Sequence, residues 1–190
     1  MVMVASSREG EEETLLAAIR AHRDAGAVQW LIVPRHPQRF DEVAALVQAE
    51  GFSLSRRSVW RDRPLPADIW LGDSLGEMAL YYGLSDAALL GGSFAPLGGQ
   101  NLIEAAACGC PVVMGPHTFN FAEAAELAAQ AQAAFRVADE AEGVDMAIRL
   151  AEPGGRHDAA AQAAVAFAAA HRGAAGKTAE AVLGLGRVGS

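Results

Sequence analysis

The sequence predicts an α/β protein in which helices cover a doubly wound, Rossmann-like parallel sheet. Short apolar runs of strand length alternate along the chain with segments of helical length. Most of these runs carry no charge, as expected for strands that are buried on both faces. Glycine or proline follows most of them, which predicts loops at the strand ends where parallel sheets bind ligands. Seven segments are candidates, and we expect five or six of them to be strands.

The first half of the chain contains four candidate strands and three helices. The strands are expected at residues 1–5, 28–34, 51–58 and 68–71, and the helices at residues 11–22, 38–50 and 75–83. Acidic residues open the first helix, where they suit the positive end of its dipole. Four arginines, Arg56, Arg57, Arg61 and Arg63, flank Trp60 and indicate a solvated loop, with a basic ligand patch as the lesser alternative. Because a core strand begins at Met1 without a lead-in, we expect the chain to be cut from a longer protein.

The second half repeats the alternation. Strands are expected at residues 87–90, 111–114 and 134–137, and helices at residues 102–109, 121–132, 139–151 and 156–172. We expect residues 1–172 to form one ligand-binding domain and the Ala/Gly-rich tail, 173–190, to fray. The Gly-x-Gly-x-x-Gly pattern of nicotinamide and flavin sites does not occur.

Composition excludes several classes of function. The net charge of -8 over 190 residues argues against nucleic-acid binding through a basic face. Hydrophobic residues make up 52% of the chain, but many are alanines, and no run of about 18 apolar residues predicts a membrane span. The N-terminal stretch is too short and too acidic for a signal peptide. Cys108 and Cys110 are too close for an ordinary disulfide and lack zinc-like partners, so we interpret both as packing residues in a reducing cytoplasm.

The stretch from Ala87 to His117 is the centre of the predicted site. A buried strand leads into a loop with two glycine pairs, Gly91-Gly92 and Gly98-Gly99, and Asn101 then opens a helix. Glycines let a backbone approach a ligand, and the free amides of a helix start bind phosphate or carboxylate. Glu104, one turn into this helix, is placed to accept hydrogen bonds from sugar hydroxyls. The plainer interpretation is that Asn101 is an N-cap and Glu104 completes a capping box, but a plain cap needs no glycine pairs.

Two other strand ends lie on the same predicted edge. Arg35 follows the second strand and suits a phosphate or carboxylate, although a solvated arginine beside a proline turn is an equal alternative. Exposed amides at Gly76 and Glu77 form another candidate edge, for which the alternative is an ordinary helix capped by Ser74.

Four motifs together carry a family resemblance. In chain order they are SSREGEE at 6–12, PRHPQRF at 34–40, LGDSLGEMALYYG at 71–83 and GGSFAPLGGQNLIEAAACGCPVVMGPHTFNF at 91–121. With this order and spacing, residues 1–150 resemble the C-terminal half of bacterial 3-deoxy-D-manno-octulosonic acid (Kdo) transferases. The glycine-loop motif alone resembles the donor-binding half of many GT-B glycosyltransferases. The sequence departs from the family at Gln100, where histidine is common, and at Ser7-Arg8, where Thr-His is common.

The resemblance implies a nucleotide site that agrees with the sheet edge described above. The family transfers Kdo from CMP-Kdo to a lipid A precursor in lipopolysaccharide biosynthesis. The resemblance implies that Pro34 and Arg35 contact the CMP, with Arg35 on the phosphate. It also implies that the backbone of Leu75, Gly76 and Glu77 holds the nucleotide. It further implies that Asn101, Leu102, Ile103 and Glu104 line the site, with Asn101 at the phosphate and Glu104 on the ribose.

The resemblance also implies what this half lacks. The family's general base, acceptor site and membrane anchor belong to an N-terminal domain, so no catalytic residue is expected here, and neither metal nor cofactor is implied. We expect the chain to be a soluble fragment that binds CMP without catalysing transfer, whereas the full-length protein acts at the cytoplasmic face of the inner membrane. Two alternatives stay open: the same half of a GT-B enzyme that uses a UDP-sugar, and a non-enzymatic nucleotide-binding α/β module.

Overall fold

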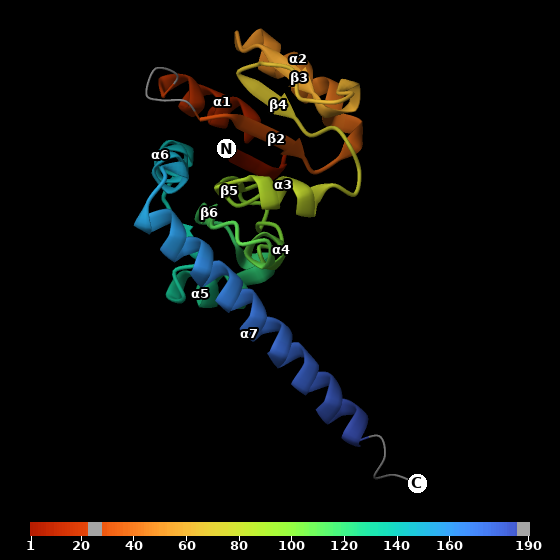
Figure 1. The fold of residues 1–190 in the computed structure, drawn as a ribbon, viewed down its shortest axis with the longest axis vertical. Helices are drawn as coiled ribbons and strands as arrows, with labels where there is room; N and C mark the ends of the chain where they lie inside the picture. The colour runs from red at the N-terminus through yellow and green to blue at the C-terminus, as the bar shows by residue number, and fades with distance from the viewer. Residues whose placement is uncertain (23–27, 186–190) are drawn as a thin grey trace.

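The computed structural model describes the backbone of residues 1–22 and 28–185, with side chains as far as Arg172 (Figure 1). Its strands form one sheet in the order β3-β4-β2-β1-β5-β6-β7, and all of the pairings are parallel. The strands are β1 (Val2–Ser7), β2 (Trp30–Pro34), β3 (Leu54–Arg56), β4 (Ile69–Leu71), β5 (Ala87–Leu90), β6 (Val112–Met114) and β7 (Ala134–Arg136). The predicted fold class, a doubly wound parallel sheet, is confirmed.

Helices connect the strands and cover both faces of the sheet. They are α1 (Glu12–Ala21), α2 (Phe40–Ala49), α3 (Met78–Leu84), α4 (Ile103–Ala107), α5 (Ala122–Gln130), α6 (Glu140–Ala151) and α7 (Gly155–Leu185). Within the described ranges, three short 3-10 helices lie between them: η1 (Pro37–Arg39), η2 (Arg57–Val59) and η3 (Phe119–Phe121).

Alternate residues of each central strand build two separate cores. Val2 and Val4 of β1 pack with α1, α2 and α6, whereas Met3 and Ala5 pack with α3, α4, α5 and α7. Since side chains of a strand alternate between faces, this division requires apolar residues at consecutive positions, as at Val2–Ala5 of β1. It explains why the apolar runs of the sequence are continuous.

The strand order of the sheet reverses at β1. Val4 of β1 aligns with Ile32 of β2 on one side and with Leu89 of β5 on the other. Strands β2, β3 and β4, which follow β1 in the sequence, lie on one side of it. Strands β5, β6 and β7 lie on the other side. Loops on the two sides separate at such a point, and ligands of open α/β sheets bind there.

The structure departs from the sequence expectations in element length and number. All seven candidate segments pair, where five or six strands were expected, because the short edge strands β3 and β7 also join the ladder. The strand expected at 51–58 is observed only at Leu54–Arg56 (β3), and its last expected residues belong to the 3-10 helix η2. Helix α3 begins at Met78, so Leu75–Glu77 belong to the preceding loop.

Helix α7 continues to Leu185, past the end expected at residue 172, and Figure 1 shows it extending away from the sheet. The helix end expected at residue 172 is therefore wrong, because alanine has the highest helix propensity and outweighs the glycines, whereas the fraying of the tail stays a prediction. Residues 186–190 lie outside the described part, and a separate role for the tail stays a prediction. Among the described helices, none combines the length and the apolar character needed to cross a bilayer.

Candidate functional site

The candidate site lies where the parallel strands end. Loops follow β1, β2, β4, β5 and β6 on the same edge of the sheet, because all strands run in one direction. The nine residues predicted from the sequence belong to three of these loops and their helix starts, after β2, β4 and β5. The fold therefore brings them to one edge, on both sides of β1.

Glu11 joins two of these loops. Its side chain follows β1, is fully buried, and accepts four backbone hydrogen bonds. One carboxylate oxygen accepts from the amides of Gly92 (2.7 Å) and Arg8 (3.1 Å), and the other from Phe94 (3.1 Å) and Ala95 (3.2 Å). Burial raises the pKa of the Glu11 carboxyl, and the four amide donors oppose that rise. The carboxylate fastens the glycine loop after β5 to the loop after β1.

This arrangement corrects the interpretation of the first glycine pair. The amides after β5 point to Glu11, so they do not form an open cradle for a ligand phosphate. Gly91 is required by packing, since a Cβ there would lie 2.1 Å from the carbonyl oxygen of Ser6. Gly98 has φ +90 and lies against Asn120. Close contacts within the protein account for both positions without a ligand.

The open part of the glycine loop comes later, just before α4. Within the described residues, the backbone amides of Gln100, Asn101 and Leu102 donate to no protein acceptor. The Asn101 side chain accepts from the amide of Ile103 at 3.0 Å, and Asn101 lies one residue before Leu102, which takes the N-cap position of α4. This bond fixes the loop and leaves the amides of Gln100 and Asn101, which are not buried residues, available to an anion.

The four predicted residues around the start of α4 differ in exposure. Asn101 and Glu104 are exposed, Ile103 is half-buried, and Leu102 is only 1% exposed within the core. Leu102 as a whole residue therefore packs against the protein, and neither its side chain nor its backbone is open to a ligand. The expected reciprocal bond from the Asn101 amide to Glu104 is absent among the described contacts, so the Glu104 carboxylate is not used as a cap.

Arg35 is an exposed arginine on the loop after β2. Pro34 is the buried last residue of that strand, and the Arg35 amide donates to the carbonyl of Ser7 at 3.0 Å, which ties this loop to β1. No carboxylate of the described residues pairs with the Arg35 guanidinium. An anionic ligand could therefore approach it without displacing a protein partner.

A buried ion pair supports the loop that carries Arg35. Arg39 donates to both oxygens of Glu12, at 2.7 Å and 3.3 Å, and to Glu42 at 2.7 Å. Arg39 and Glu12 are 6% and 2% exposed. The neighbouring acidic residues Glu11 and Glu12 thus hold the loops on the two sides of β1. Sequence reasoning missed these contacts, and only the acidic run after Gly10 hinted at them.

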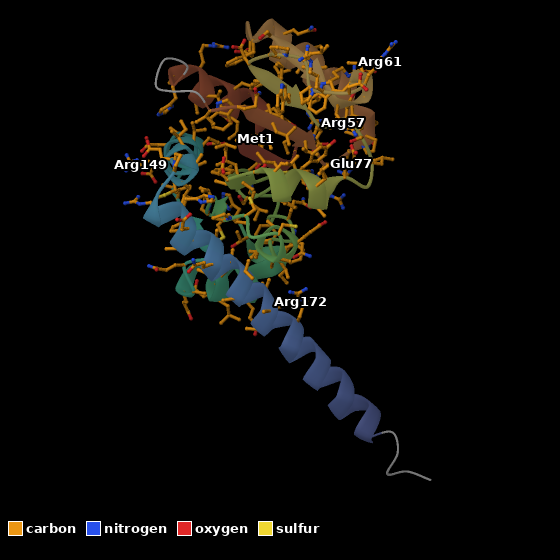
Figure 2. The ribbon with its side chains drawn as sticks, viewed as in Figure 1. Met1, Arg57, Arg61, Glu77, Arg149 and Arg172 are labelled. Carbon is orange, nitrogen blue, oxygen red and sulfur yellow. The ribbon has the colours of Figure 1, made fainter. Side chains whose placement is uncertain are left out.

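The loop after β4 places Glu77 inside a polar cluster. Glu77 pairs with Arg57 at 2.8 Å and accepts from Ser74 and from the Tyr81 hydroxyl. Figure 2 shows Arg57 and Glu77 next to each other. The Ser74 hydroxyl lowers the pKa of Glu77 most strongly, and Arg57 lowers it further. Ser74 therefore binds side chains here, and the alternative that it caps the helix is wrong.

Leu75 and Gly76 lie open on the same loop. The Leu75 side chain is 76% exposed, and Gly76 has φ +78 with free space around the position of a Cβ. Just before them, the buried Asp73 carboxylate accepts from Arg56 (2.7 Å) and from the hydroxyl of Ser58 (2.6 Å). The backbone of Leu75–Glu77 is thus exposed, and the contacts of Asp73 fix the start of the loop that carries it. Within the described residues there is no cluster of three or more His, Cys, Asp or Glu side chains that could hold a metal ion.

Comparison with known sequences finds related proteins of greater length. The chain is 49% identical over 187 residues to the 3-deoxy-D-manno-octulosonic acid transferase of Bordetella pertussis, which covers 96% of this chain and 44% of that protein. It is 39% identical over 150 residues to the transferase of the same name from Haemophilus influenzae, covering 77% and 34%. The chain thus spans less than half the length of these curated relatives. No protein-family model matches it.

Solved structures give the same correspondence in three dimensions. The C-terminal CMP-Kdo binding domain of WaaA from Acinetobacter baumannii superposes with a TM-score of 0.81 and 30% sequence identity, covering 87% of each chain. A glycosyltransferase from Rickettsia africae has a TM-score of 0.54 at 16% identity and shares the fold with 44% of its length.

Proposed function

The chain belongs to the Kdo transferase family, corresponding to its C-terminal domain, and we propose that it binds the CMP-Kdo donor for transfer of Kdo. One observation carries this proposal. A solved domain whose name gives CMP-Kdo as its ligand aligns with nearly the whole chain at 30% identity. The sheet edge described above supports it, because it carries two available amides before α4, the exposed Arg35, which has no carboxylate partner among the described residues, and the exposed Glu104.

We assign the parts of the nucleotide to the predicted residues by their chemistry. Arg35 and the amides of Gln100 and Asn101 suit the phosphate, because a guanidinium and unpaired N–H groups both donate to anionic oxygens. Glu104 suits the ribose, since a carboxylate accepts hydrogen bonds from two hydroxyls. The open backbone at Leu75–Glu77 suits the remainder of the nucleotide. In a protein of net charge -8, such local donors are needed to attract an anionic ligand.

The reaction of the whole protein extends beyond this chain. We propose that the acceptor is a lipid A precursor and that the enzyme has two GT-B halves and works at the inner membrane in lipopolysaccharide biosynthesis. The relatives are more than twice as long as the aligned segment. Transfer between donor and acceptor needs both to be oriented, so this domain alone should bind donor without turnover.

Nucleotide preference tests the proposal. CMP should raise the melting temperature of the chain more than UMP does at the same concentration, because a ligand selective for the folded state stabilises it by mass action. At 100 times its dissociation constant the gain is about 2.7 kcal/mol, or roughly 5–10 °C for a protein of this size. The measurement is differential scanning fluorimetry with CMP, CDP, UMP and UDP. Equal or reversed shifts would favour a UDP-sugar enzyme, and no shift with any nucleotide would favour a module without this function.

Replacing Glu104 by glutamine tests the ribose assignment. The change should weaken CMP binding by roughly 1.5–3 kcal/mol, the range for hydrogen bonds to a charged group, which is about 10- to 150-fold in affinity. The fold should be unaffected because Glu104 is exposed and forms no cap. Titration calorimetry measures the affinity, and Glu123→Gln, an exposed glutamate in the first turn of α5, is the matched control. Unchanged affinity in a folded Glu104→Gln protein would remove Glu104 from the site.

A further inference from the structure

A second group of donors lies beside the proposed nucleotide site, at the point where β1 and β5 diverge. A Cβ built on Gly92 would lie 3.6 Å from Cγ of Arg8 and 3.4 Å from Nε2 of Gln100. The two side chains therefore flank the same stretch of backbone, although one follows β1 and the other follows β5. The backbone amide of Gln100 is also the first of the two available amides before α4.

The protein holds this arrangement firmly through Glu11. The same carboxylate oxygen accepts from the amides of Arg8 and Gly92, so the backbone that carries Arg8 is fastened to the glycine loop. The Arg8 side chain takes no part in that contact. Its position against Gly92 is thus set by a buried group, while its guanidinium stays at the surface.

The guanidinium of Arg8 has only a weak protein partner. It pairs with Glu9 at 3.1 Å, and the two side chains are 25% and 54% exposed. Exposed ion pairs contribute little, because water and salt screen them. Glu9 lies also 3.8 Å from Nε of Arg39, so it keeps a cationic neighbour if Arg8 turns to a ligand. Arg8 can therefore exchange its partner at small cost.

We propose that Arg8, with the side-chain amide of Gln100 beside it, binds the carboxylate of the donor's sugar acid and so distinguishes CMP-Kdo from CMP. This inference rests on the proposed function, since it needs CMP at the adjacent edge. A nucleotide whose phosphate lies at Arg35 and the amides before α4 has its sugar extending from that phosphate, and Gln100 joins the two places. The sugar is an octulosonic acid, and a planar guanidinium pairs with a carboxylate through two parallel hydrogen bonds.

Calorimetric titration of the 190-residue chain with CMP and with freshly purified CMP-Kdo tests the proposal. The wild type should bind CMP-Kdo at least about tenfold more tightly than CMP, as expected for one charge-assisted pair. Arg8→Gln should bring the two affinities to within about twofold and leave CMP affinity unchanged. The variant should fold, because only the backbone amide of Arg8 is used by Glu11. Arg149→Gln is the matched control, since Arg149 also forms an exposed pair, with Asp145, and lies away from Arg57 and Glu77 in Figure 2.

The possible failures are distinguishable. If Arg8→Gln weakens CMP and CMP-Kdo equally, Arg8 binds the phosphate and the carboxylate subsite is wrong. If the preference for CMP-Kdo survives in Arg8→Gln, or is missing from the wild type, the subsite is also wrong although CMP binding stands. If the wild type binds neither ligand, the proposed function fails, and this inference fails with it.

Discussion

Replacing Gly91 by alanine should destabilise the protein by about 3 kcal/mol or more, the upper range for overpacking a buried site. The added Cβ would lie 2.1 Å from the carbonyl oxygen and 2.5 Å from the carbonyl carbon of Ser6. Both are backbone atoms at the end of β1, so no side-chain rotation relieves the contact. The amide of Gly91 also donates to the carbonyl of Ala5 at 2.8 Å, which keeps the two strands together at this point. Thermal unfolding should show a melting temperature lower by roughly 6–12 °C.

Gly83→Ala is the matched control for this experiment. Gly83 lies within α3, is exposed, and has no atom within 4 Å of the position of a Cβ. Alanine there should leave stability unchanged or raise it by up to about 1 kcal/mol, because glycine is unfavourable in a helix. A Gly91→Ala protein that melts together with wild type would show that β1 and β5 are less closely packed than described. It would also reopen the interpretation that Gly91 serves a ligand.

The sequence is sufficient to predict the sheet because its signal is local. Apolar runs such as 2–5 and 87–90 must be buried on both faces, and a parallel sheet covered by helices is the fold that does so. The edge strands were harder to predict. Leu54–Arg56 and Ala134–Arg136 each pair with a neighbouring strand on one side only. Polar residues are therefore tolerated in these strands, and hydrophobic periodicity does not define where the strands begin and end. Helix α7 exceeded its expected end because glycines weaken a helix without stopping it.

The positions of the site residues also followed from the sequence, since strand ends of a parallel sheet must share an edge. The contacts that hold these loops in place could not be predicted from the sequence. Three of the four residues whose amides Glu11 binds lie more than 80 positions away along the chain, and no local pattern specifies which amides a buried carboxylate will meet. For the same reason the first glycine pair was interpreted as a ligand cradle. Close approach of two backbones and close approach of a ligand require glycine equally.

Removing the Glu11 carboxylate should have the other large effect. Glu11→Ala leaves the amides of Arg8, Gly92, Phe94 and Ala95 without their acceptor, at two buried bonds (Gly92 and Phe94) and two partly buried ones. Each unsatisfied buried donor costs about 1–3 kcal/mol, and water entering the vacated space offsets part of the sum. We expect a loss of roughly 3–5 kcal/mol, measured as a lower urea midpoint with an unchanged slope. Glu13→Ala, an exposed position two residues along the chain, is the control and should stay near wild type.

Glu11→Gln separates the charge of this group from its shape. A glutamine keeps one oxygen that can accept from two amides, but its NH2 group then faces the other two N–H donors, and neither orientation of the side chain avoids this. The variant also escapes the cost of burying a charge, the same effect that raises the pKa of Glu11. Its loss should therefore lie between wild type and Glu11→Ala, at roughly 2 kcal/mol. If an ionised Glu11 carboxylate joins the two loops through hydrogen bonds, stability should decrease from wild type to Glu11→Gln to Glu11→Ala. A glutamine variant as stable as wild type would show that Glu11 is held neutral, and that packing of β1 against β5, rather than four amide bonds to a carboxylate, fixes the glycine loop.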